Sequence, residues 1–318
     1  MNLIRLIPFF FWLTVITVIP YPVYGAARQG ALISLQTLSP ADQESLITAI
    51  QRARKDYPTI FTAVSQIREN LPQLDRVKRG LYPVITPLLK SLGPEALYPV
   101  LERIAVSDVS SDDLTDSAWS AWRASLLEAA GMCRDERAEP VLRAVLQSNQ
   151  DEFLIIQAAA AYGKLASDQV VDLLINMSAE AGPKQLAILA GMGHCRRLVI
   201  AQRLAEILAE KPEKQTALVV AQSLGRVGSA WAWQTEVIAR CHEEVPTRTL
   251  AARALITAFT SYDRDVRIQI THAILVVDHP STLDFIREQK HRSSPELHPE
   301  LDELRNRFQK SPLRVKSK

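Results

Sequence analysis

The sequence predicts an all-α protein built as a stack of helical hairpins. Aromatic residues make up only 6% of the chain and 47% of it is hydrophobic, a composition that favours helices over sheets. Stretches rich in Ala and Leu repeat their apolar residues at helical spacing. Similar segments also recur about every 30 to 34 residues, which is typical of helical-repeat architectures.

The first 25 residues have the three-part pattern of an export signal. A short basic start ends at Arg5, an almost wholly apolar run extends from Leu6 to Ile19, and a turn-prone end reaches Gly25. The apolar run is shorter than the ~20 residues of a membrane-spanning helix, which favours cleavage after Gly25 over retention as an anchor. We therefore expect a periplasmic or secreted protein with no integral membrane span after cleavage.

The region from residue 26 to 112 contains helical patterns that are less regular than those that follow. A capping signal at Ser39 opens the first of two expected helices, which together extend to about residue 70. The motif Leu-Tyr-Pro-Val begins at Leu81 and again at Leu97, and it predicts two short helices. This region is a candidate cap or divergent repeat.

Each predicted repeat has a marker residue at the end of its first helix, which is Gly in four repeats and Phe in the fifth, followed by a polar turn. These markers are separated by 32, 30, 32 and 34 residues. Four residues after most markers stands a side chain that can accept from the free amides of a helix start; Arg197 breaks the pattern. Proline, which fits the first turn of a helix, separates successive hairpins. The markers are Gly131, Gly163, Gly193, Gly225 and Phe259, the caps Asp135, Ser167, Ser229 and Asp263, and the prolines Pro183, Pro212, Pro246 and Pro280.

Four segments of this array share their patterns with one known repeat family. Gln222–Ser229 is similar to an "A-L-G-x-L-G-D" turn and Arg248–Leu255 to a "V-R-x-x-A-A-x-A-L" first helix. Ala138–Leu142 resembles the start of a second helix, and Asp265–Arg267 resembles a "D-x-V-R" segment. The array resembles short HEAT repeats of the phycobilisome-lyase type. The resemblance implies a right-handed α-solenoid of antiparallel hairpins and says little about function, because the shared residues pack, cap and turn the chain. The tetratricopeptide repeat, with a period of 34, is the alternative.

The chain thus divides into four parts. A polar, acidic segment around residues 107–116 separates the N-terminal region from the array, and Gln309–Lys318 is basic and without periodicity, which predicts a disordered tail. The parts are a signal peptide (1–25), an N-terminal helical region (26–112), a HEAT-like array (113–290) and a C-terminal helix with a basic tail (291–318).

The cysteines and two histidines form the candidate metal set. Cys133 and Cys195 are expected in equivalent turns two repeats apart, beyond the ~7 Å Cα separation of a disulfide, so buried, unpaired thiols are predicted. His194 and Cys195 with Cys241 and His242 are donors that zinc accepts. The two pairs lie 46 residues apart, and a regular stack would place them at opposite edges. No metal is therefore predicted.

No catalytic motif is found. The sequence contains no nucleophile elbow, H-E-x-x-H, P-loop or dinucleotide fingerprint, so we predict no catalytic residue and no cofactor. The formal net charge of +2 gives no field that points to nucleic acid.

Tryptophans are the first candidates for a binding surface. Trp119 and Trp122 are three residues apart and share a helix face, whereas Trp231 and Trp233 open a second helix and must point different ways. Exposed tryptophans suit a binding hot spot. Packing within the fold is the alternative, because Trp is largely buried in most proteins.

Arginines near the predicted turns are the second candidates. Five arginines can line an anion-binding groove if they face one side: Arg196, Arg197, Arg203, Arg226 and Arg240. An ordinary solvated surface with alternating glutamates is the alternative.

The sequence predicts an exported, non-enzymatic interaction or scaffold protein that binds a protein or peptide on the surface of the stack. A cell-envelope enzyme accessory is one alternative; it rests on the lyase resemblance, although an export signal argues against cytoplasmic chromophore chemistry. An envelope lipid or polysaccharide binder is the other, suggested by the basic tail and the paired tryptophans.

Overall fold

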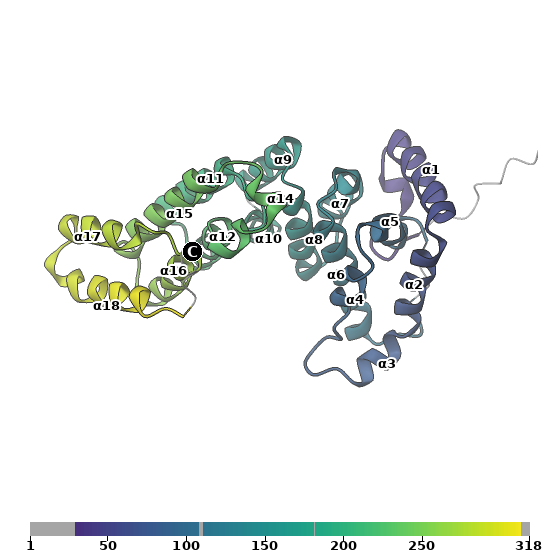
Figure 1. The fold of residues 1–318 in the computed structure, drawn as a ribbon, viewed down its shortest axis with the longest axis horizontal. Coiled ribbons are helices and arrows are strands. Elements are labelled where there is room, and N and C mark those ends of the chain that lie inside the picture. Colours follow the sequence, from purple (N-terminus) through teal and green to yellow (C-terminus); the bar gives the residue numbers. More distant parts are fainter. Residues whose placement is uncertain (1–28, 108–110, 181, 313–318) are drawn as a thin grey trace, which may run out of the picture.

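The computed structural model describes residues 29–107, 111–180 and 182–312, and over this part of the chain it is all-α, with only an isolated bridge between Gln29 and Ser34 outside the helices and turns. The helices follow one another along an elongated molecule, from α1–α5 at one end to α17 and α18 at the other (Figure 1). The predicted signal peptide and the last residues of the predicted tail lie outside the described residues. Among those that are described, no helix is both long and apolar enough to cross a bilayer.

In the N-terminal region, α1 and α2 pack on α5, whereas α3 and α4 contact α2 and α6. Ser39 caps α1 by accepting from the Asp42 amide, which confirms the predicted capping signal. The chain before α1 is fixed on the end of α5, where the Ala31 amide donates to the Arg103 carbonyl at 2.7 Å. The helices are η1 (Leu35–Thr37), α1 (Pro40–Asp56), α2 (Pro58–Glu69), α3 (Leu71–Arg76), α4 (Thr86–Lys90), η2 (Pro94–Ala96) and α5 (Leu97–Ala105).

Only one of the two Leu-Tyr-Pro-Val motifs is helical. The second copy opens α5, where Pro99 lies in the first turn and needs no amide partner. The first copy, at Leu81, lies in the connection between α3 and α4, so the prediction of a helix there is wrong. A helix that started at Leu81 would place Pro87 in its interior, four residues after Pro83, where the ring clashes with the carbonyl. The helix therefore begins at Thr86 instead.

The middle of the molecule is a series of helices that pack on one another. α6, α8, α10 and α12 pack consecutively, while α7, α9 and α11 contact the helices beside them. The close approach of α6 and α8 depends on Gly131, because a Cβ there would lie 2.5 Å from the Ala161 Cα. The helices are α6 (Asp116–Met132), η3 (Glu136–Ala138), α7 (Glu139–Gln147), α8 (Glu152–Leu165), α9 (Asp168–Ala179), α10 (Gln185–Met192), α11 (Leu198–Ala209) and α12 (Lys214–Val227).

The predicted helix caps are confirmed. The side chains of Asp135, Ser167, Ser229 and Asp263 each accept from a backbone amide two or three residues further along the chain. At the exception, Arg197, no local side chain caps α11. Its first-turn amide, at Leu198, instead donates to Glu243 Oε2 at 2.6 Å, across 45 residues of sequence.

The order of packing changes after α12. Instead of one long second helix, the chain forms two single-turn helices and reaches the start of α11, so that α15 packs on α11 and α16 packs on α12. A Cβ on Gly225 would lie 2.8 Å from the Cα of Ala273 in α16. Gly225 therefore lies against α16, whereas Gly131 lies against α8, the first helix of the next predicted repeat. The helices are α13 (Ala230–Trp233), α14 (Glu236–Ala239), α15 (Glu244–Phe259), α16 (Arg264–Val277), α17 (Thr282–Arg292), η4 (Pro295–Leu297) and α18 (His298–Gln309).

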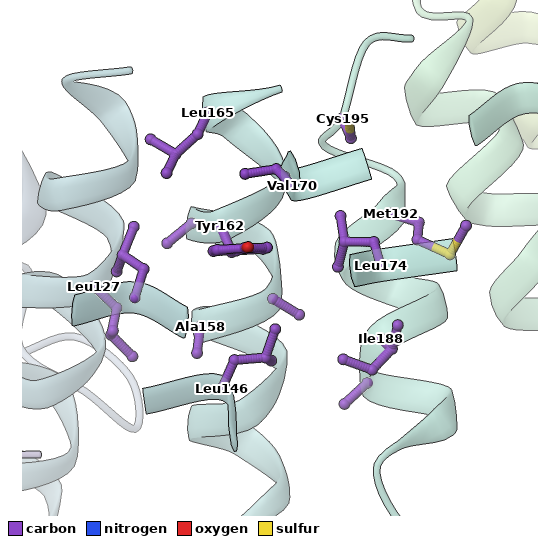
Figure 2. Close-up of a cluster of buried hydrophobic side chains, with 14 of the residues drawn as sticks. Leu127, Leu146, Ala158, Tyr162, Leu165, Val170, Leu174, Ile188, Met192 and Cys195 are labelled. Carbon is purple, nitrogen blue, oxygen red and sulfur yellow. The ribbon is translucent and has the colours of Figure 1, made fainter. Parts of the chain in front are cut away.

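One continuous core runs through the stack. Figure 2 shows the section between α6 and α10, in which Tyr162 of α8 lies among aliphatic side chains of its neighbours. The buried Tyr162 hydroxyl donates to Glu139 Oε1 at 2.8 Å, and burial, with this hydrogen bond, raises the pKa of the tyrosine. Leu165 and Cys195 lie at the same edge of this section, beside the turns that follow α8 and α10 (Figure 2).

Candidate functional site

The four tryptophans do not form one surface. Trp122 and Trp233 are fully buried, and the Trp233 Nε1 donates to the Val227 carbonyl at 2.9 Å. Both are core residues in the described fold, so neither indole is exposed on its surface. Trp119 is half-buried against the core, with the Arg123 guanidinium 5.5 Å from its ring centroid. Trp231 is 59% exposed, which confirms that it and Trp233 point different ways.

Three of the five predicted arginines, Arg196, Arg197 and Arg226, lie near one another. The other two, Arg203 and Arg240, are paired with Glu206 and Glu236 and do not line the same pocket. Arg196 and Arg197 line a pocket of about 380 Å³. Arg226 is half-buried beside it, close enough that its charge contributes to lowering the pKa of Arg196. Two further cations of this pocket, Arg134 and Lys164, were missed in the sequence. They follow the markers Gly131 and Gly163 by three and one residues, so comparing turn positions between repeats could have found them.

The cysteines are unpaired, as predicted, but only Cys195 is fully buried. Cys241 is exposed and lines the basic pocket, where its Sγ lies 4.0 Å from the Arg196 carbonyl. The two Cys/His pairs therefore share one edge, and the expectation of opposite edges is wrong because α13 and α14 carry the chain back across that edge. Within the described residues, no three His, Cys, Asp or Glu side chains are grouped to hold a metal ion.

A groove along α1 has a volume of about 1000 Å³. Its floor is the outer face of α1, on which small side chains recur at helical spacing. Its other wall is formed by η2, the start of α5 and Arg137. The small residues are Ala41, Ser45, Thr48, Ala49 and Ala53, and the opposite wall contains Pro94, Leu97 and Tyr98.

Tyrosine and arginine side chains define the rim of this groove. Tyr57 lies at the end of α1 and is 47% exposed. On the other wall, the Arg137 guanidinium is 5.2 Å from the Tyr98 ring centroid. Asp135 holds Arg137 in place by accepting from its Nε at 2.8 Å, and this side-chain interaction raises the pKa of the guanidinium. Arg137 is therefore a fixed cation at the rim.

Charges of both signs surround the groove: Glu44, Asp56 and Glu95 face the same hollow as Arg52 and Arg137. Sequence patterns did not single out these residues. The groove exists because α1 and α5 pack together, and nothing in the local sequence of α1 indicates which residues will lie opposite its outer face.

Comparison with protein-family models and with curated proteins finds no match for this chain. The fold and its hollows alone define the class to which it is assigned: an all-helical protein of many packed helices, compatible with a helical-repeat fold, with a peptide-sized groove at one end and a basic pocket at its middle.

Proposed function

We propose that this chain is an exported, non-enzymatic interaction protein that holds an extended peptide segment of a protein partner in the groove along α1. The single observation that carries the proposal is the groove itself: a hollow of about 1000 Å³ beside a helix whose outer face bears small side chains. The proposal includes a HEAT-type, right-handed α-solenoid. The consecutive packing of α6, α8, α10 and α12 supports that architecture.

The dimensions suit an extended peptide. α1 has 17 residues, which at 1.5 Å rise each makes the floor about 25 Å long. An extended chain advances about 3.3 Å per residue, so the groove accommodates about seven residues. The small side chains allow a peptide backbone to approach α1 closely, while bulkier side chains of the peptide have room in the hollow.

The chemistry of the rim suits recognition of a charged peptide. Tyrosine and arginine are enriched among the residues that dominate binding energy at protein interfaces, and Tyr57, Tyr98 and Arg137 all border this groove. Because Arg137 is fixed by Asp135 before a partner arrives, little side-chain entropy is lost on binding. Acidic and basic groups along the two walls would set the direction in which the peptide lies.

Site-specific photocrosslinking tests the proposal. A photoreactive residue at Ser45, in the groove, is compared with one at Thr257, which is exposed on α15 and away from the groove. We expect position 45 alone to capture a protein partner in the cells that export the chain. The captured segment is then synthesised, and its affinity is measured for the wild type, Ser45→Trp and Thr257→Trp.

Ser45→Trp fills the groove and is expected to weaken binding at least about tenfold, a loss of about 1.4 kcal/mol, whereas Thr257→Trp leaves affinity unchanged. Equal capture at both positions, or equal affinity of both variants, would count against the groove.

The two alternative functions receive less support. Envelope lipid or polysaccharide binding drew on the tryptophans, of which Trp122 and Trp233 are buried. An enzyme-accessory role has no further observation in its favour. Recovery of lipid or glycan instead of a protein in the crosslinking experiment would move the assignment to the first of these alternatives.

A further inference from the structure

We propose that the basic pocket at the edge of the stack is a binding site for a phosphoryl or sulfuryl oxyanion, either free or esterified. This site is separate from the groove along α1 and does not depend on its function. Four cationic side chains and one carboxylate line the pocket: Arg134, Lys164, Arg196, Arg197 and Glu243.

The one carboxylate of the pocket is already engaged. Glu243 Oε1 accepts from Arg197 Nε at 3.1 Å, and its other oxygen accepts from the Leu198 amide. Arg197 is further paired with Asp168 at 2.9 Å. Glu243 and Arg197 therefore largely neutralise each other, and the remaining cations of the pocket have no such compensation.

Arg134, Lys164 and Arg196 form no ion pair within the part of the chain that the structure describes. Two of them are instead fixed by backbone carbonyls at helix ends. Arg134 Nη1 donates to the Lys164 carbonyl at 2.8 Å, and Arg196 Nη1 donates to the Gly193 carbonyl at 2.7 Å. The Nε of Arg196 is buried without a hydrogen-bond partner in the same described part. The pocket is thus a rigid cluster of like charges with donor capacity left over.

The cations of the pocket repel one another. Burial, followed by the charges of Arg134 and Arg226, lowers the pKa of Arg196 to about 10, so it stays protonated at neutral pH. Burial, followed by the charges of Arg196 and Lys164, lowers the pKa of His194 to about 3, which leaves that imidazole neutral. Only Glu128 acts on Lys164 in the opposite sense, after burial has lowered the lysine pKa. A bound anion would relieve this repulsion.

Geometry favours a tetrahedral oxyanion over a single carboxylate. The three uncompensated cations come from three helices that pack side by side: Arg134 and Arg196 follow the ends of α6 and α10, and Lys164 lies in the last turn of α8. Guanidinium groups match phosphate and sulfate oxygens with paired donors. A volume of about 380 Å³ exceeds the size of a bare anion and leaves room for an esterifying group.

Thermal unfolding and calorimetry of the full chain test the site. Inorganic phosphate or sulfate, in excess, is expected to raise the melting temperature above that measured in chloride at equal ionic strength, because a ligand that binds only the folded state stabilises it. Arg196→Gln and Lys164→Gln are each expected to weaken phosphate binding at least about tenfold, the effect of losing one charge-assisted hydrogen bond.

The matched control is Arg203→Gln, which removes an arginine that pairs with Glu206 at 3.5 Å on α11, outside the pocket. It should bind phosphate as the wild type does. Far-UV circular dichroism of each variant separates lost binding from lost folding, and Lys164→Gln keeps the test open if Arg196→Gln does not fold.

Two further probes distinguish the source of the anion. If glycerol phosphate binds and phosphatidic acid vesicles do not, the ligand is a soluble phosphate ester. If the vesicles bind and Arg196→Gln abolishes that binding, the ligand is a lipid headgroup. The proposed site is contradicted if phosphate stabilises the protein no more than chloride does. It is also contradicted if both variants bind phosphate like the wild type.

Discussion

Glu243 is expected to hold the irregular part of the stack in place, and removing it should destabilise the protein by about 2 kcal/mol. Its Oε2 provides the cap that α11 lacks locally, at 2.6 Å from the Leu198 amide, and losing a helix cap costs about 1 kcal/mol. Its pair with Arg197 is about three-quarters buried, with side-chain exposures of 24% and 29%, and adds about 1 kcal/mol after allowance for solvent screening. Glu243→Gln keeps an acceptor and should cost about half as much.

Urea unfolding followed by circular dichroism measures this loss. The control is Glu210→Ala, which removes an exposed glutamate at the C-terminal end of α11. It should change the free energy of unfolding by less than about 0.5 kcal/mol. In a double-mutant cycle, Arg197→Ala and Glu243→Ala should couple by about 1 kcal/mol. A cost for Glu243→Ala no larger than that of the control, with no coupling, would show that α15 does not start beside α11.

Three smaller changes test other parts of the structure. Gly225→Ala should destabilise the protein by about 1 to 3 kcal/mol in thermal unfolding, because the added methyl group meets Ala273. An unchanged melting temperature would contradict the close contact between α12 and α16. Trp233→Phe should cost about 1 kcal/mol by leaving the Val227 carbonyl without its donor, and tryptophan quenching by iodide should detect Trp231 more readily than the buried Trp233. Burial and neighbouring cations lower the pKa of His194 from 6.5 to about 3. The unfolded state therefore binds the extra proton, and the stability of the fold decreases as pH drops from 6.5 toward 3, by up to about 1.4 kcal/mol per pH unit. His194→Gln should flatten this part of the stability profile, and an unaltered profile would contradict the burial of His194.

Local signals predicted the local structure well. Ser167 and Asp263 cap helices as their positions in the repeat indicated, because a cap depends only on a side chain and an amide three residues away. Gly131 likewise marks a close helix crossing, because the absence of a Cβ at this single position allows the neighbouring helix to approach.

Features that depend on distant parts of the chain could not be predicted in this way. Gly225 packs against Ala273 of α16 because α13 and α14 do not form one long helix. Glu243 then contacts the start of α11, 45 residues earlier in the chain. Trp119 and Trp122 lie on related faces, yet their different burial depends on which neighbouring helices cover each position. Two of the three arginines of the basic pocket, Arg196 and Arg197, were identified, whereas Arg134 and Lys164 became part of it only when the helix ends were brought together.

The site of the partner can be located by hydrogen–deuterium exchange of the full chain, with and without the peptide captured from position 45. Binding in the groove predicts slower exchange in α1 and over residues 94–98, which form its two walls, and unchanged exchange in α17 and α18. Protection confined to the far end of the stack, or absent from α1, would show that the peptide is held elsewhere.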